Sequence, residues 1–324
     1  MTVVRFALKP AALALAAALV AAGGAQAGET REVSEAFVTN QTGDSLSVVE
    51  LATLKVADTI KIGGKPAGIA MSVDGSRAFV TAPEAKELVV VDAVKRQVVK
   101  RIKVGAGPLG VAAHPTNGRV YVADWYEHKV FVVDPDAGTI VAEIQVGQSP
   151  SGLAVTPDGR LLLSADRDSS AVSFIDPQTN ARLGGVKVGK RPFGITIDAA
   201  GVRAYTANVA SDDVSVIDIA RRKVIATVPV GRRPYDVALA GGRAFVTNQY
   251  GDSVSVIDLP SAKVVKTIDV GDHPEGIEAD RAGAYVYVAC WFDNVLQRID
   301  AAKLTHSGEA EVGDGPRAFG PFLR

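Results

Sequence analysis

Short apolar runs separated by turn residues recur along the chain from about residue 35 to the C-terminus. The runs are rich in Val, Ile, Thr and Tyr, and Gly, Pro, Asn and Asp separate them, which is typical of short strands joined by tight turns. No segment keeps a 3.6-residue apolar period, so we expect almost no helix. Within 187–228 the pattern predicts four strands, at 193–197, 204–208, 214–218 and 223–228.

The four-strand pattern repeats about every 42 residues. Each repeat carries a glycine followed three residues later by a proline. Successive glycines are 42 residues apart, except for an interval of 40 between the fifth and the sixth: Gly63, Gly105, Gly147, Gly189, Gly231, Gly271 and Gly313. An acidic residue ends the third strand with the same spacing, at Glu50, Asp92, Asp134, Asp176, Asp218, Asp258 and Asp300. Two independent columns in one register indicate a true internal repeat.

Four antiparallel strands in each repeat of this length are typical of a β-propeller blade. The whole repeats cover about 61–102, 103–144, 145–186, 187–228, 229–268 and 269–310. The remaining parts, 35–60 and 311–323, add up to one further blade, and joining them hides the edges of an open array. We therefore predict an all-β, seven-bladed propeller of four-stranded blades over 28–324, with the C-terminal strand pairing with the N-terminal blade to close the ring.

The N-terminal residues have the pattern of a cleaved signal peptide, 1–27. Arg5 and Lys9 precede an apolar run at 11–22, and Ala25-Gln26-Ala27 is a small-x-small cleavage pattern, which places cleavage before Gly28. The alternative is a retained anchor, but the run is short for a bilayer, which needs about 20 apolar residues. We expect export to the periplasm, with no membrane span after cleavage.

Charge and cysteine content narrow the function classes. The chain has 35 basic and 36 acidic residues, and loss of two basic residues with the signal peptide changes the net charge from −1 to −3. This balance argues against a protein-wide field that attracts nucleic acid or an anionic membrane. Cys290 is the single cysteine, so no intrachain disulfide forms. It fits a buried inert thiol, or a catalytic thiol whose histidine partner the sequence does not locate.

The second-strand segments carry a family resemblance. They read AFVTN at 36–40 and 244–248, VYVAD at 120–124 and AYTAN at 204–208, and DVSVID follows at 213–218. These segments resemble the YVTN-repeat, YncE-like β-propellers. The resemblance implies an exported propeller. Similar propellers occur beside quinone- and copper-dependent oxidoreductases, some YncE-like members bind DNA, and related folds include lactonases. The recurring residues are structural, so they imply the fold and leave the function open.

Function should lie where blades depart from the repeat, and the first departure is aromatic. The two positions after the second strand carry Trp125-Tyr126, Trp291-Phe292 and Tyr250, where other blades have small or polar residues. These loops should share a face with the Gly-x-x-Pro turns, around the mouth of the central channel. The aromatic side chains could anchor a ligand by stacking, or could pack over neighbouring loops as a lid.

The second departure is charge within the Gly-x-x-Pro turns. Two neighbouring blades carry the basic pairs Lys190-Arg191 and Arg232-Arg233, beside an acidic sector with Asp272 and His273. The basic pairs could hold an anion or steer a charged partner, or form a solvated cluster. In the column after the prolines, Arg317 and Glu275 are expected to point toward the channel, and Phe193 and Tyr235 occupy the same column.

No catalytic set emerges from the remaining residues. The acidic residue repeated in each blade is expected to bond to the backbone of the next turn. The histidines His114, His128, His273 and His306 lack ligand spacing, and the sequence has no known nucleotide, hydrolase, zinc or haem motif. We predict no catalytic residue, no metal site and no cofactor.

The leading hypothesis is a monomeric, non-enzymatic binding or scaffold propeller whose mouth binds a protein or a small anionic ligand. The first alternative is a lactonase-like hydrolase, or an accessory subunit of a periplasmic quinone- or copper-dependent oxidoreductase. The second alternative is YncE-like nucleic-acid binding through the basic pairs and mouth aromatics.

Overall fold

The computed structural model describes residues 1–3 and 35–324, so the apolar run and cleavage site predicted near the N-terminus lie outside the described residues. One compact unit, Val33–Arg324, holds all the strands described below. In the described part of the chain, no helix is long and apolar enough to cross a membrane.

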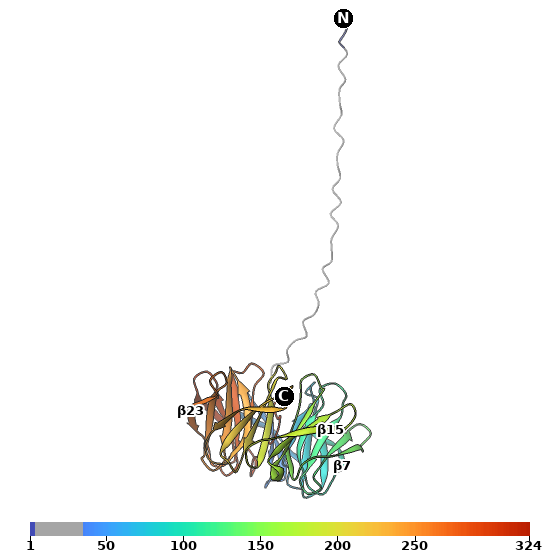
Figure 1. Ribbon diagram of the computed structural model, residues 1–324, viewed down its shortest axis with the longest axis vertical. Coiled ribbons are helices and arrows are strands. Elements are labelled where there is room, and N and C mark those ends of the chain that lie inside the picture. Colours follow the sequence, from blue (N-terminus) through green and yellow to red (C-terminus); the bar gives the residue numbers. More distant parts are fainter. Residues whose placement is uncertain (4–34) are drawn as a thin grey trace. The chain divides into compact units, whose positions relative to one another are not determined.

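The unit Val33–Arg324 consists of seven antiparallel sheets, six with four strands and one with three (Figure 1). In each four-stranded sheet the strands pair in sequence order, as expected for propeller blades. The first strands line the centre: β4 (Ile69–Met71), β8 (Pro108–Ala113), β12 (Pro150–Val155), β16 (Pro192–Ile197), β20 (Pro234–Ala240) and β24 (Pro274–Ala279). The second strands are β1 (Glu35–Asn40), β5 (Arg77–Ala82), β9 (Val120–Asp124), β13 (Leu162–Asp166), β17 (Arg203–Asn208), β21 (Arg243–Asn248) and β25 (Tyr285–Cys290).

The third and outer strands complete each blade. The third strands are β2 (Ser45–Glu50), β6 (Glu87–Asp92), β10 (Lys129–Asp134), β14 (Ala171–Asp176), β18 (Asp213–Asp218), β22 (Ser253–Asp258) and β26 (Val295–Asp300). The outer strands are β3 (Lys55–Lys61), β7 (Gln97–Lys103), β11 (Thr139–Gln145), β15 (Ala181–Lys187), β19 (Lys223–Pro229), β23 (Lys263–Asp269) and β27 (Thr305–Glu311). Among the described residues the only helix is the 3₁₀ turn η1 (Arg167–Ser169). The all-β, seven-bladed prediction is confirmed.

The C-terminal residues lie beside β1 without forming a named strand. The backbone N–H of Phe37 donates to Phe322, that of Arg324 donates to Glu35, and that of Arg317 donates to Thr39, at 2.8–2.9 Å. Isolated bridges join Ala36 to Leu323 and Asn40 to Pro316. The first blade therefore has three assigned strands, and a kinked C-terminal segment stands where a regular fourth strand was predicted.

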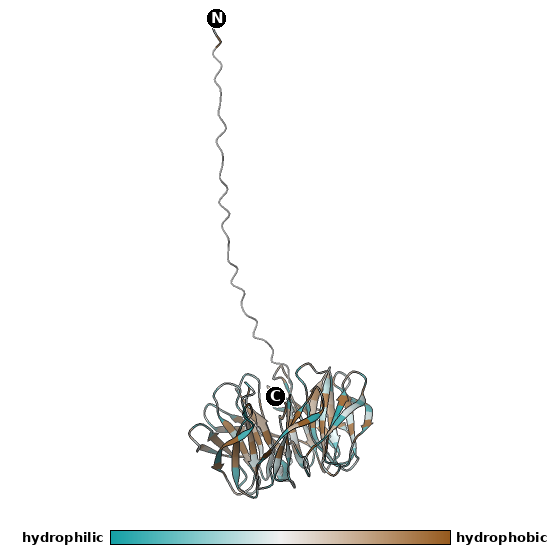
Figure 2. Ribbon diagram, turned by 180° about the vertical axis from the view of Figure 1, so that it is seen from behind, coloured by the Kyte–Doolittle hydropathy of each residue, from teal (hydrophilic) through white to brown (hydrophobic). Residues whose placement is uncertain are grey.

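The hydrophobic core lies between neighbouring blades. For example, Phe79, Leu88 and Val90 of one blade pack with Val111 and Phe131 of the next. Burial of such a side chain contributes about 1.5–3 kcal/mol. Figure 2 shows hydrophobic residues in the strands and mostly hydrophilic residues in the loops. The outer strands are largely exposed, in keeping with their many charged residues.

Six of the seven acidic residues that end the third strands, all of them aspartates, have the structural role predicted for them, whereas the Glu50 carboxylate accepts from the hydroxyl of Thr53. Asp92 accepts hydrogen bonds from the backbone N–H groups of Val94 and Lys95, and Asp300 bonds in the same way to Ala302 and Lys303. Such bonds favour the ionised carboxylate, and they lower the pKa of both aspartates. These residues stabilise turns and are not a repeated active site.

Candidate functional site

The turns that enter the inner strands lie beside the loops that join the second and third strands. The backbone N–H of Trp125 donates to Gly107, that of Val209 donates to Arg191, and that of Trp291 donates to His273, at 3.0–3.1 Å. We call this end of the propeller the mouth face. All the candidate site residues predicted from the sequence stand in its loops or directly after its prolines.

Three buried aromatic rings from different blades meet at the centre of the mouth face. The ring centroid of Phe193 lies 4.5 Å from that of Tyr235 and 4.9 Å from that of Phe319. Trp125 packs against the edge of this aromatic cluster, with its ring centroid 6.3 Å from that of Phe193. Its side chain is only partly buried. The cluster therefore fills the channel at the mouth, and Trp125 contributes to packing as well as to the surface.

A buried ion pair lies beside the aromatic cluster. Arg317 Nε lies 3.1 Å from Glu275 Oε2 and donates a hydrogen bond of 2.8 Å to the hydroxyl of Tyr235. Gln249 donates to the other carboxylate oxygen of Glu275 at 2.6 Å, and Arg233 donates to Gln249 at 2.7 Å. The network thus connects the buried pair to a basic side chain at the surface.

The two members of this pair support each other's charge. Burial raises the pKa of Glu275, and the charge of Arg317 opposes that rise. Burial alone would lower the pKa of Arg317, but Glu275 and Tyr235 raise it. Both residues are held by protein partners, so the pair is a positioning element of the mouth face.

Two further arginines, Arg167 and Arg191, lie near the surface end of this network, which Arg233 forms. Burial lowers the pKa of Arg167, and the nearby charges of Arg191 and Arg233 lower it further, while Asp168 opposes the shift. Asp168 Oδ1 lies 2.6 Å from Arg167 Nη1 and 3.8 Å from Arg191 Nε, so one carboxylate faces two guanidinium groups. Lys190 and Arg232 are exposed beside them. We call Arg167, Lys190, Arg191, Arg232 and Arg233 the basic sector.

Exposed aromatic side chains flank the basic sector. Tyr126, Tyr250 and Phe292 are 70%, 46% and 60% exposed. The guanidinium of Arg233 lies 4.5 Å from the ring centroid of Tyr250. The imidazole of His273 lies between the rings of Tyr250 and Phe292, at 5.2 and 4.5 Å. Trp291 is partly buried, and its ring lies 5.8 Å from the Arg317 guanidinium.

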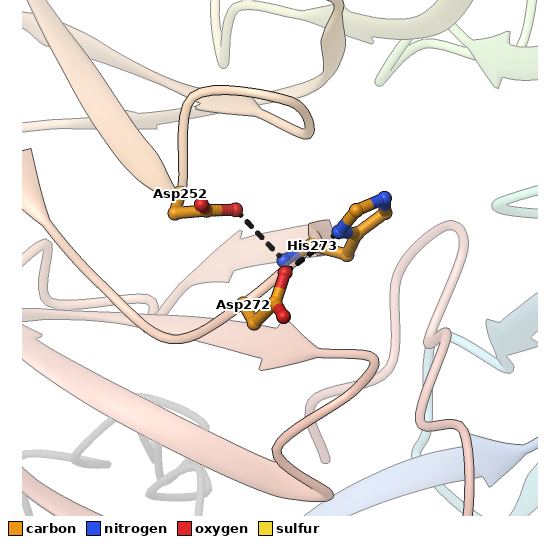
Figure 3. Close-up of side chains that lie close together, drawn as sticks. All are labelled: Asp252, Asp272 and His273. Carbon is orange, nitrogen blue, oxygen red and sulfur yellow. Dashed lines mark hydrogen bonds and ion pairs between the residues drawn. The ribbon is translucent and has the colours of Figure 1, made fainter.

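Asp252, Asp272 and His273 form the one cluster in the described chain whose ligand atoms are close enough for a metal ion (Figure 3). Asp252 accepts from the backbone N–H of His273 at 3.1 Å, and the imidazole contacts Asp272 at 2.7 Å. The Asp252 contact recurs in other blades. For example, Asp212 accepts from Arg233, and Asp44 accepts from Lys65. The cluster is therefore explained by a repeated loop bond.

His128 and Cys290 also have structural partners. His128 Nδ1 accepts from the backbone N–H of Ser149 at 3.0 Å, in the position that aspartate holds in other blades. Cys290 is fully buried, and burial raises the pKa of its thiol to about 12. The thiol is therefore protonated at neutral pH, which favours the inert over the nucleophilic interpretation.

Sequence reasoning missed two parts of the mouth face. Arg167 stands in the column where the aromatic departures were sought, so its charge was not counted with the basic pairs. Gln249 precedes Tyr250 and links Arg233 to Glu275. Both residues come directly after a second strand. A comparison of this position across the blades by charge and hydrogen-bonding capacity, as well as by aromatic character, identifies them.

Comparison with known proteins agrees with this fold. Residues 15–119 match the model of the family described as YNCE-like beta-propeller. The seven antiparallel sheets define the chain as a seven-bladed β-propeller. The matched part, about a third of the chain, agrees with the resemblance of its repeats to the YncE-like propellers. No curated protein matches the chain.

Several solved structures share the fold at low sequence identity. Hydrazine synthase of Kuenenia stuttgartiensis aligns with a TM-score of 0.72 and 22% identity, covering 78% of this chain and 88% of that chain. A functionally unknown protein from Desulfotomaculum acetoxidans aligns with a TM-score of 0.75 and 16% identity, covering 89% of this chain and 99% of that chain. Dihydro-heme d1 dehydrogenase NirN, in complex with DHE, aligns with a TM-score of 0.65 and 14% identity, covering 89% of this chain and 74% of that chain. These similarities concern the fold.

Proposed function

We propose that this protein is an exported, non-enzymatic β-propeller whose mouth face binds an acidic segment of a partner protein. The observation that carries the proposal is that Arg167 and Arg191 both face the single carboxylate of Asp168, and that the charge of Arg233 is near enough to lower the pKa of Arg167. Crowded guanidinium groups repel one another, and an anion between them relieves that repulsion. Arginine also suits this role because its planar fork binds a carboxylate through two hydrogen bonds.

The surroundings of the basic sector favour an acidic protein over a long polyanion. Tyr126, Tyr250 and Phe292 add exposed aromatic surface of the kind that anchors protein partners. The same face carries Asp252 and Asp272, which would repel the backbone of an extended nucleic acid. A short acidic segment can occupy the basic sector without crossing these groups.

Features of the described mouth face also weigh against a hydrolase. Asp272 and His273 form an acid–histidine pair. Among the described residues, however, no serine or cysteine side chain is hydrogen-bonded to that imidazole. A nucleophilic mechanism requires such a contact. An accessory role beside an oxidoreductase remains a second candidate, because two proteins of similar fold are named as enzymes, hydrazine synthase and a dihydro-heme d1 dehydrogenase.

Export is part of the proposal and rests on the sequence pattern of residues 5–27. Expression of the full chain in a Gram-negative host followed by fractionation tests it. We expect a periplasmic product whose mass corresponds to a chain beginning at Gly28. Full-length protein in the cytoplasmic fraction would contradict export and leave the binding proposal to be judged separately.

Binding is tested by fluorescence anisotropy with a labelled glutamate-rich peptide. Arg191→Ala with Arg233→Ala should weaken binding about tenfold or more, since hydrogen bonds to charged groups contribute about 1.5–3 kcal/mol each. The matched control, Lys223→Ala with Lys263→Ala, removes the same charge from the exposed outer strands β19 and β23 and should retain affinity. An equal loss of affinity in both double variants would show that the peptide responds to net charge alone and does not bind at the mouth face. Tighter binding of single-stranded DNA than of the peptide would favour the nucleic-acid alternative.

A further inference from the structure

The inner strands enclose a cavity of about 460 Å³ beneath the aromatic cluster. Its wall runs from Phe319 to Pro115, Pro157 and Ala199, in the turns that follow β8, β12 and β16. The cavity therefore opens on the face opposite the mouth face. Its volume falls within the range of about 300–1,000 Å³ that is typical of small-molecule sites.

The cavity wall is largely aliphatic, with two carboxylates among its lining residues. Asp236 is the second residue after its proline, a position held by glycine in five other repeats, at Gly68, Gly110, Gly152, Gly194 and Gly276. Glu278 is the fourth residue after its proline, where the other repeats have Ala70, Ala112, Ala154, Thr196, Ala238 and Gly320. Both carboxylates are thus single departures from columns of small, mostly uncharged residues.

Each carboxylate has one oxygen held by the backbone and one without a partner among the described residues. Asp236 is only 6% exposed, and its Oδ1 accepts from the N–H of Val237 at 2.8 Å. Glu278 Oε2 accepts from the N–H groups of Phe322 and Leu323 at 2.5 and 2.7 Å. Asp236 Oδ2 and Glu278 Oε1 make no hydrogen bond in the described structure, and both residues line the cavity.

Neighbouring residues leave room for the Asp236 carboxylate. A Cβ atom at Gly194 would lie 2.2 Å from Asp236 Oδ1, so the glycine is needed for this side chain to fit against β16. The remaining wall is formed by side chains such as Val111, Leu153 and Ile277. No lysine or arginine stands among the described residues that line the cavity.

Two carboxylates in an aliphatic wall, Asp236 buried and Glu278 partly buried, are costly in their ionised form when no ion pair compensates them. Burial raises the pKa of Asp236 to about 7 and that of Glu278 to about 8; the charge of Asp236 adds to the shift at Glu278, and the charge of Arg281 opposes it. A cation placed between them would remove this cost. A positively charged molecule with an apolar body would complement both the carboxylates and the aliphatic wall.

We propose that this cavity binds a small organic ammonium ion, with its nitrogen paired to Asp236 and Glu278 and its apolar body against the aliphatic wall. A divalent metal ion fits less well, because Ca²⁺ requires about six to eight oxygen ligands. Besides the two carboxylates, the lining side chains supply only the hydroxyls of Thr156 and Thr196, and Thr156 already bonds to Asp158. This site is independent of the mouth face.

Isothermal titration calorimetry with phenethylammonium chloride tests the proposal, using 2-phenylethanol as the neutral probe of nearly equal shape. We expect one ammonium ion to bind per chain, and the alcohol to bind about tenfold or more weakly, because it cannot donate a charged hydrogen bond to the carboxylates. Asp236→Asn with Glu278→Gln should weaken ammonium binding by a similar factor and leave alcohol binding nearly unchanged. Equal affinity for the two probes, or no binding of the ammonium ion, would overturn the proposal.

Two further variants make the result specific to the cavity. Glu84→Gln with Asp269→Asn removes two exposed carboxylates elsewhere and should retain full affinity. Ala154→Leu narrows the cavity without changing its charge and should also weaken binding. Unchanged binding in Ala154→Leu, or displacement of the ammonium ion by stoichiometric Ca²⁺, would contradict the assignment. Thermal unfolding of each variant establishes that it is folded before it is titrated.

Discussion

Replacement of Asp236 and Glu278 by their amides should change how stability depends on pH. Folding raises the pKa of Asp236 from 3.8 to about 7 and that of Glu278 from 4.5 to about 8. Between the unfolded and folded pKa values, the folded chain binds more protons than the unfolded chain. The stability provided by each protonated group is therefore fully present below about pH 4 and is lost as pH rises to about 8.

The size of the effect follows from the pKa differences. Each difference is about three pKa units, and one unit corresponds to about 1.4 kcal/mol, so each group costs at most about 4 kcal/mol when ionised. Because the cavity admits solvent to both groups, we expect about 2 kcal/mol for each. Asparagine and glutamine keep the oxygen atoms that accept from Val237, Phe322 and Leu323.

Urea unfolding at about pH 5 and about pH 8 measures this difference. The unfolding free energy of the parent protein should fall relative to that of Asp236→Asn with Glu278→Gln as pH rises. Glu84→Gln with Asp269→Asn should follow the parent protein. Parallel pH curves for the parent and the amide variant would refute the argument that burial of these two carboxylates costs stability.

Two other stability and reactivity predictions follow from the mouth face and its surroundings. Arg317→Met should cost about 3–5 kcal/mol in urea unfolding because it leaves Glu275 buried and unpaired, and adding Glu275→Gln should recover part of the loss; equal stability of the single and double variants would contradict this coupling. Cys290 should resist iodoacetamide in the folded protein and react on unfolding, because burial keeps its thiol protonated. Rapid alkylation under native conditions, followed by mass spectrometry, would show that the thiol is accessible.

Much of the fold could be predicted from the sequence because every blade solves the same packing problem. The strands expected at 204–208 and 214–218 begin one residue earlier in the structure, as β17 and β18, and end where expected. The C-terminal segment is less regular than expected, because Pro316 and Pro321 cannot donate backbone hydrogen bonds to a continuous ladder.

The sites were less predictable because they depend on distances between blades. The sequence indicates that Phe193 and Tyr235 share a column, but their contact with Phe319 across the channel requires the closed arrangement. Asp236 and Glu278 could have been found as departures within the inner-strand columns. Their shared exposure to one cavity, however, follows only from the packing of β20 beside β24.

Hydrogen–deuterium exchange in the presence and absence of the glutamate-rich peptide tests most directly whether the mouth face is the binding surface. We predict slower exchange in the loops at 190–193, 232–235 and 249–251, with little change in the turns of the opposite face. Protection confined to the opposite face or to the outer strands, or no protection at a saturating peptide concentration, would contradict the proposed function.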